Sequence, residues 1–187
     1  VAFNALPAQT TDDYMTRQYF QQVNQINVME RESNFDVNHS GLDGCFGLLT
    51  GFPCCTSNMH QGWPKFTQNL WYATPDGGLA ATVYSPSSVR TRVAGGVDVK
   101  ISEMTKYPFE EMVTFRIDEM SRNTEFPFVV RIPSWSVKTS VKVNGKEIFD
   151  VANVDNLLTV KRKWKKGDVM ELSFTPQVRL TLWKENA

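Results

Sequence analysis

The stretch ATPDGGLAATVYSPSSV, residues 73–89, marks the point where the chain changes from a helical to a β-strand pattern. Its PDGG segment is a turn signal, because proline and glycine favour backbone conformations that interrupt regular elements. From this turn onward, short runs rich in β-branched and aromatic residues alternate with turn residues. The stretch therefore predicts that the chain after it is built mainly from short strands.

The region after residue 77 repeats these strand signals. Val113, Phe115 and Ile117 alternate with polar residues, as in a strand with one buried face. Asn144-Gly145 predicts a tight hairpin, and residues 166–168, Lys-Gly-Asp, predict another turn. Short strands at regular spacing are typical of a β-sandwich. The predicted strands cover residues 79–84, 88–93, 97–104, 112–118, 126–132, 139–143, 157–163, 169–175 and 178–182.

The first part of the chain has a different character, so we expect two domains, residues 1–77 and 78–187. Thr56 or Ser57 is a suitable cap for a helix that runs to about Tyr72, and Pro64 predicts a kink or a later helix start. Residues that support this helix recur at spacings of three and four; they are Met59, Trp63, Phe66, Leu70 and Trp71.

The composition is that of a globular protein and excludes some partners. Of the 187 residues, 41% are hydrophobic, and 20 basic residues balance 20 acidic ones. A nucleic-acid-binding domain would carry an excess of basic charge, so we expect no nucleic acid. No apolar run reaches the 18 or so residues of a membrane span. The basic run KRKWKK, residues 161–166, is interpreted as a solvated strand end and turn.

The sequence opens VAFNALPAQ, without an initiator methionine and with apolar residues typical of the middle of a helix. We therefore expect the chain to be a piece of a longer protein. Any targeting signal would then lie upstream, which leaves the localisation open between a bacterial periplasm and cytoplasm.

The adjacent cysteines Cys54 and Cys55 are the main chemical candidates. A helix N-terminus stabilises a thiolate, the form that acts as a nucleophile or metal ligand. A disulfide between neighbours would be strained, and the spacing to Cys45, His39 and His60 matches no standard zinc motif. The residues alone therefore leave open a buried pair, a metal site and a nucleophile.

The residues after the cysteine pair are candidates for binding a sugar. Asn58, His60 and Gln61 offer polar groups for hydroxyls, and Trp63 offers a ring face for stacking. The alternative is that Trp63 packs in the core and Asn58 is only a polar residue near a helix start.

Several of these segments resemble glycoside hydrolase family 127, the group typified by bacterial β-L-arabinofuranosidase. The specific part is PCCTSNMHQGW, residues 53–63, in which Asn follows the first cysteine by four residues. Supporting segments are NLWYATPDGGLAATVYSPS, RIPSWS and VNG, residues 69–87, 131–136 and 143–145. The resemblance implies a mainly β chain: a β-sandwich preceded by a helical segment from the end of an (α/α)6 barrel.

The resemblance also implies a retaining glycosidase mechanism with a zinc-bound cysteine. Cys54 would be the nucleophile and a zinc ligand, and Cys55 a zinc ligand. A further cysteine, a glutamate ligand and the glutamate acid/base would lie upstream of residue 1, in the missing barrel, so the chain alone would be inactive. Asn58, His60 and Trp63, chosen above for their chemistry, would then be the substrate-binding residues beside this centre. Gln61 stands where the family pattern has arginine, which leaves the sugar specificity open.

The rival interpretation is a non-catalytic carbohydrate-binding or structural β-sandwich module. A structural zinc site is a second, weaker rival.

Overall fold

The computed structural model describes residues 11–13, 58–149, 151–178, 180 and 182. The chain forms two compact units, residues 1–68 and 69–187. The cysteine pair lies outside the described residues. None of the helices in the described part is long and apolar enough to cross a membrane.

The described part of the first unit contains a short helical segment. The 3-10 helix η1, Met59–Gln61, leads directly into α3, Gly62–Gln68. Pro64 is the third residue of α3, in the first turn, where its missing N–H breaks no helical hydrogen bond. Residue 58 is already helical and the residues before it lie outside the described part of the chain, so the later helix start stays a prediction.

The predicted extension of this helix to Tyr72 is wrong. α3 ends at Gln68, and Trp71 begins a strand. Leu70 is buried in the second unit, and its carbonyl accepts a hydrogen bond from the Thr82 N–H at 3.4 Å. Strand pairing thus satisfies the backbone of this segment and overrides its helical spacing.

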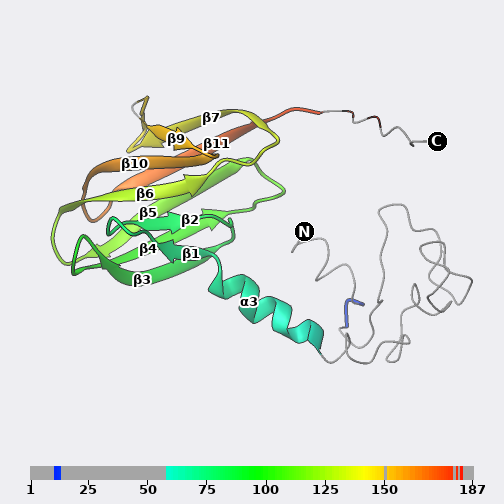
Figure 1. Cartoon of the computed structure of the whole chain (residues 1–187), viewed down its shortest axis with the longest axis horizontal. Helices are drawn as coiled ribbons and strands as arrows, with labels where there is room; N and C mark the ends of the chain where they lie inside the picture. The colour runs from blue at the N-terminus through cyan, green and yellow to red at the C-terminus, as the bar shows by residue number, and fades with distance from the viewer. Residues whose placement is uncertain (1–10, 14–57, 150, 179, 181, 183–187) are drawn as a thin grey trace, which may run out of the picture. The chain divides into compact units, whose positions relative to one another are not determined.

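The second unit is a sandwich of two β-sheets (Figure 1). One sheet has the order β1-β2-β6-β10-β9 and the other the order β3-β4-β5-β11-β7-β8. β2 and β6 pair in parallel, and the other recorded pairs are antiparallel. The strands are β1 Trp71–Ala73, β2 Leu79–Ala81, β3 Ser87–Val93, β4 Val97–Thr105, β5 Met112–Met120, β6 Thr124–Arg131, β7 Ser136–Val143, β8 Lys146–Glu147, β9 Ala152–Val154, β10 Leu157–Trp164 and β11 Val169–Pro176.

The core lies between the two sheets and is rich in aromatic rings. Phe115 of β5 meets Phe128 of β6 edge to face, with ring centroids 5.0 Å apart. Trp164 contacts Phe128 as well, at 6.0 Å, and its indole N–H donates to the Phe126 carbonyl at 3.1 Å. The aromatic contacts join strands of both sheets, so burial of these rings holds the two layers together.

The sandwich and most of its predicted strands are confirmed. Asn144 and Gly145 have φ of 52° and 77° between β7 and β8, as a tight hairpin turn requires. The 166–168 turn connects β10 to β11. Trp135 stacks on Tyr107 at 6.3 Å, so it serves as a packing residue of the sandwich.

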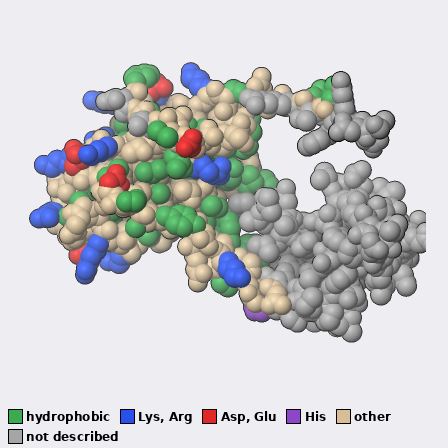
Figure 2. All heavy atoms as spheres, in the orientation of Figure 1, with side chains coloured by type: hydrophobic (Ala, Val, Ile, Leu, Met, Phe, Trp, Pro, Cys, Tyr) green, Lys and Arg blue, Asp and Glu red, His purple; other side chains and the backbone are tan. Residues whose placement is uncertain are grey.

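The run KRKWKK also behaves as interpreted. Its residues occupy the end of β10 and the following turn, and its four lysines are exposed, whereas Trp164 is buried. On the face shown in Figure 2, Lys and Arg side chains lie mostly around the rim of the sandwich, with hydrophobic side chains between them.

The predicted strand at residues 178–182 is wrong for the residues that the structure describes there. Residues 177, 178, 180 and 182 form no strand, and Val178, Leu180 and Leu182 are each about nine-tenths exposed. β11 ends at Pro176, which cannot donate a backbone hydrogen bond. An alternating pattern forms a strand only where a neighbouring strand supplies hydrogen bonds.

Candidate functional site

The three predicted sugar-binding residues lie on one short stretch: Asn58 directly precedes η1, His60 is in η1 and Trp63 is in α3. Asn58 and His60 are exposed, and Trp63 is 41% exposed, so it is not a core residue. The Gln61 amide donates to Asn58 Oδ1 at 2.6 Å, and the Trp63 ring meets Phe66 edge-on at 6.4 Å. This short segment therefore presents polar groups and an indole ring at its surface. Their role in substrate binding stays a prediction.

The metal and nucleophile predictions fall on Cys54 and Cys55, outside the described residues. Within the part of the chain that the structure does describe, no group of three or more His, Cys, Asp or Glu side chains could hold a metal ion. The zinc site and the cysteine nucleophile therefore stay predictions.

The sandwich contains two buried charged side chains among its described residues, Glu103 and Asp168, exposed by 2% and 1%. Glu103 accepts hydrogen bonds from the Ser85 N–H at 3.0 Å and from the Ser87 hydroxyl at 3.1 Å. Burial raises the pKa of Glu103 to about 8, although these two hydrogen bonds act in the opposite direction. A carboxyl group that changes its charge near neutral pH is thus built into the sandwich.

Sequence reasoning did not single out Glu103, although the signal was present. In β4 the residues Val97, Val99 and Ile101 point inward, and the period of two places Glu103 on the same face. A glutamate that continues an alternating row of buried apolar residues is the sequence signal that identifies Glu103 as buried.

A tyrosine faces this glutamate and in turn contacts an arginine. The buried Tyr84 hydroxyl donates to the Arg131 carbonyl, and the Arg131 guanidinium lies 5.7 Å from the centroid of the Tyr84 ring. Arg131 Nε donates to the Thr82 carbonyl at 2.6 Å. Burial raises the pKa of Tyr84 above its usual range, so this phenol stays neutral. The arrangement fixes the 82–84 segment against the end of β6.

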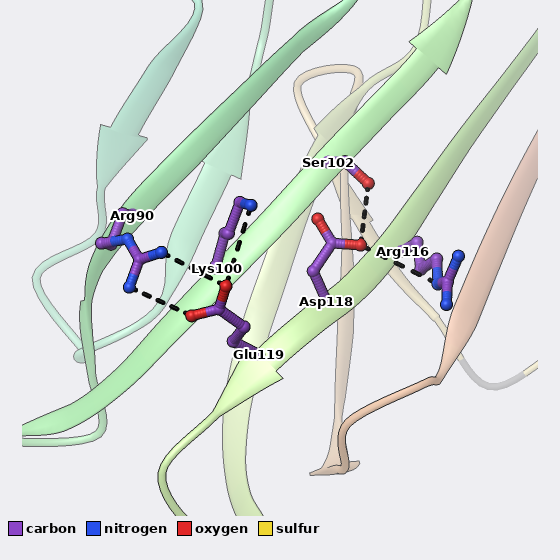
Figure 3. A network of polar contacts seen from close by, with 6 residues as sticks. All are labelled: Arg90, Lys100, Ser102, Arg116, Asp118 and Glu119. Atoms are coloured by element: carbon purple, nitrogen blue, oxygen red, sulfur yellow. Dashed lines mark hydrogen bonds and ion pairs between the residues drawn. The ribbon is translucent and has the colours of Figure 1, made fainter.

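The outer face of the six-stranded sheet carries a network of charges (Figure 3). A β-bulge between β4 and β5 creates it: Lys100 pairs with Glu119, but the next residue, Ile101, pairs with Ile117. Asp118 is left without a residue opposite, and its side chain and that of Glu119 lie near each other on one face (Figure 3).

Both carboxylates of the bulge already have partners. Arg90 bonds to both oxygens of Glu119, at 3.0 and 3.2 Å. Asp118 accepts from the Ser102 hydroxyl at 3.2 Å and lies 3.8 Å from Arg116. Exposed ion pairs of this kind stabilise the fold by about 0–1 kcal/mol each. Because both carboxylates are engaged in such pairs, we interpret this face as a solvated surface and not as a catalytic acid/base pair. A shallow groove of about 330 Å³ follows the network, lined by Arg90, Asp98, Val99, Lys100, Glu119, Met120 and Ser121.

Several solved structures share the fold. One is a GH127 β-L-arabinofuranosidase from Geobacillus stearothermophilus T6, with 27% identity, a TM-score of 0.60, and coverage of 65% of this chain and 19% of its own. A glycoside hydrolase has 20% identity and a TM-score of 0.68, over 92% of this chain and 27% of its own. A GH127 β-arabinofuranosidase has 24% identity and a TM-score of 0.58, and the match covers 65% of this chain and 21% of that protein. Among curated proteins, none matches the chain significantly.

This chain spans between 19% and 27% of the length of those three proteins. Its residues 78–176, more than half of the sequence, match the model of the β-L-arabinofuranosidase GH127 middle domain. The matched segment runs from just before β2 to the end of β11 and contains nearly the whole sandwich. The chain therefore belongs to the GH127 β-L-arabinofuranosidase family, and its sandwich is the middle domain of that family.

Proposed function

We propose that this chain is part of a glycoside hydrolase that cleaves glycosidic bonds of β-L-arabinofuranosides or related sugars. The match of residues 78–176 to the GH127 middle domain carries the proposal, supported by the likeness to the Geobacillus arabinofuranosidase. Because the chain spans about a fifth of that relative, we expect turnover only from the longer polypeptide, in which a helical barrel supplies the remaining groups.

The proposed reaction is a double displacement with retention of configuration. The Cys54 thiolate attacks the anomeric carbon, the bond to the leaving oxygen breaks, and a general acid protonates that oxygen. Water then attacks the same carbon, the carbon–sulfur bond breaks, and the acid group, now a base, takes the proton. Bound zinc, held by Cys54, Cys55 and upstream residues, would keep the thiol deprotonated.

The described residues support a sugar-binding role for the segment after the cysteines. Asn58, His60 and Trp63 are exposed on one short stretch, and a sugar site needs both hydrogen-bonding groups and an aromatic face. We propose that these three side chains contact the substrate.

Cysteine substitutions in the full-length parent test the proposal. We expect Cys54→Ser to reduce kcat on an aryl β-L-arabinofuranoside by roughly a thousandfold or more, as loss of a nucleophile does. Cys55→Ser should lower both the bound zinc, measured by mass spectrometry of metals, and the activity. Cys45→Ser is the matched control and should retain turnover.

Unchanged turnover in Cys54→Ser would exclude the thiolate mechanism and favour the rival, a non-catalytic carbohydrate-binding module. Assays on a wider panel of glycosides would give the sugar specificity. Turnover by the 187-residue chain alone would contradict the expectation that the catalytic site needs residues outside it.

A further inference from the structure

The indole of Trp71 begins a chain of hydrogen bonds that crosses the sandwich. Trp71 Nε1 donates to the Ser87 hydroxyl at 3.0 Å, and this hydroxyl lies 3.1 Å from Glu103 Oε2. Trp71 belongs to β1 of the five-stranded sheet, whereas Ser87 and Glu103 are partners on β3 and β4 of the other sheet. We call these three side chains the cross-sheet relay.

The strand that the relay holds has few other attachments. β1 is three residues long, lies at the edge of its sheet and pairs only with β2 among the described strands. The Trp71 ring packs on Phe115 at 5.7 Å and on Phe128 at 6.1 Å, one from each sheet. The position of β1 therefore depends on its tryptophan, and the only recorded hydrogen bond of that indole is to Ser87.

Glu103 has no positive partner to stabilise a charge. No ion pair joins it to any Lys or Arg of the described residues, and Arg131 directs its Nε to the Thr82 carbonyl instead. Tyr84 is the titratable group that faces it from the 82–86 segment. Its cross-strand neighbours on β3 and β5, Ser87 and Phe115, are uncharged. A buried carboxyl in these surroundings is stable mainly in its neutral form.

We propose that the cross-sheet relay is a pH-sensitive clasp that holds β1 against the sandwich while Glu103 is protonated and loosens as Glu103 ionises. β1 is the first strand of the second unit, so the clasp controls how the start of this unit is attached to the rest of the sandwich. This inference concerns the sandwich and does not depend on the proposed glycosidase activity.

The direction of the pH effect follows from proton linkage. The pKa of Glu103 is about 8 when the clasp is closed and close to the usual 4.5 when opening lets water reach the carboxyl. Closing is then coupled to proton uptake, so the clasp is most stable at acid pH. Its stability is lost progressively as the pH rises toward 8.

Residue-resolved hydrogen exchange of the 187-residue chain tests the clasp. Protection factors, corrected for the intrinsic rate, are measured between pH 5.5 and 7.5 for the N–H groups of Thr74 and Thr82, which bond to the Gly78 and Leu70 carbonyls. We expect protection to fall by at least about tenfold over this range. Amides of β10 and β11 serve as the internal reference and should not change in the same way.

Two substitution sets make the test specific. Glu103→Gln should remove the pH dependence, whereas Glu119→Gln, in the exposed network, should leave it as in the unmodified chain. Ser87→Thr keeps the hydroxyl and should preserve the clasp, whereas Ser87→Val has a similar shape without it and should weaken protection at every pH. The Thr/Val pair gives an answer even if Glu103→Gln fails to fold.

Three results would overturn the proposal. The first is protection of the Thr74 and Thr82 amides that does not change with pH in the unmodified chain. The second is an equal change in the protection of the β10 and β11 amides. The third is equal protection in Ser87→Thr and Ser87→Val.

Discussion

Gly78 lies where the backbone of β6 passes too close for a side chain. A Cβ atom at this position would meet the Pro127 carbonyl oxygen and ring at less than any normal contact, and would lie 2.7 Å from Thr74 Oγ1. The Gly78 N–H also donates to that hydroxyl at 2.9 Å. Because a carbonyl oxygen in a sheet cannot move independently, Gly78→Ala must separate β2 from β6.

We expect Gly78→Ala to lower the free energy of unfolding by about 1–3 kcal/mol or more, as overpacking does. Urea denaturation measures the change. Gly95→Ala is the control, because Gly95 has φ of 72° and open space around it. Gly95→Ala should lower the free energy of unfolding by only about 1 kcal/mol, because alanine disfavours the left-handed backbone conformation. An equal cost at both positions would contradict the steric explanation.

Glu103 shows what sequence reasoning reaches and misses at the scale of single residues. The alternation in β4 predicts that residue 103 faces inward, but not that a serine on β3 and an indole on β1 meet it there. Those contacts depend on pairing between distant segments, which a one-dimensional pattern does not contain. The role predicted for Cys54 likewise depends on the family resemblance, because the residues alone left several alternatives open.

At the scale of elements, two turns are locked together by an asparagine and an aspartate. Asn144, in the β7–β8 turn, donates through Nδ2 to Asp168 Oδ1 at 2.9 Å and accepts the Val169 N–H at 2.9 Å. The other Asp168 oxygen accepts the Lys165 N–H at 3.1 Å. Asp168 is buried, so removing its partner leaves a carboxylate oxygen with unmet hydrogen bonding.

We expect Asn144→Gly to destabilise the chain by about 2 kcal/mol, because glycine tolerates the positive φ but loses both side-chain hydrogen bonds. Asn156→Gly is the matched control. Asn156 also has a positive φ, 62°, but no recorded side-chain hydrogen bond to a described residue. It should be nearly neutral in thermal or urea unfolding. If the two variants were equally destabilised, the lock between the turns would contribute nothing.

The predicted elements succeed or fail according to their length and partners. Long strands such as β4 and β5 show a full alternation and were predicted within about two residues of their ends. β1, β8 and β9 have three residues or fewer, too short for any period to emerge. The parallel β2–β6 pairing joins segments about fifty residues apart, and no local signal specifies it.

At the scale of the whole molecule, the fold class was predictable from the sequence pattern. Turn residues and alternating strands specify a sandwich, and the structure has one. The expected boundary after residue 77 follows the change in sequence pattern and stays a prediction. The compact unit begins at Asn69, because Leu70 and Trp71 pack into the sandwich despite their helical spacing.

This difference gives a prediction about which fragment folds alone. Every buried hydrophobic residue of the described core lies between Leu70 and Phe174, and about 119 residues is a normal size for an independent domain. We expect residues 69–187 to unfold in one cooperative transition, with the same midpoint as the sandwich in the 187-residue chain. Circular dichroism during heating measures it.

A fragment that starts at residue 78 retains the family match but lacks β1. It loses the Trp71 ring between Phe115 and Phe128, and it leaves Ser87 without its indole donor. Removal of a packed tryptophan costs about 3–5 kcal/mol, so this fragment should melt at a clearly lower temperature than residues 69–187. A fragment of residues 69–187 that carries Trp71→Ala distinguishes the contribution of the ring from that of the strand. It should recover little of the lost melting temperature. Equal stability of the two fragments would show that β1 is not part of the folding unit.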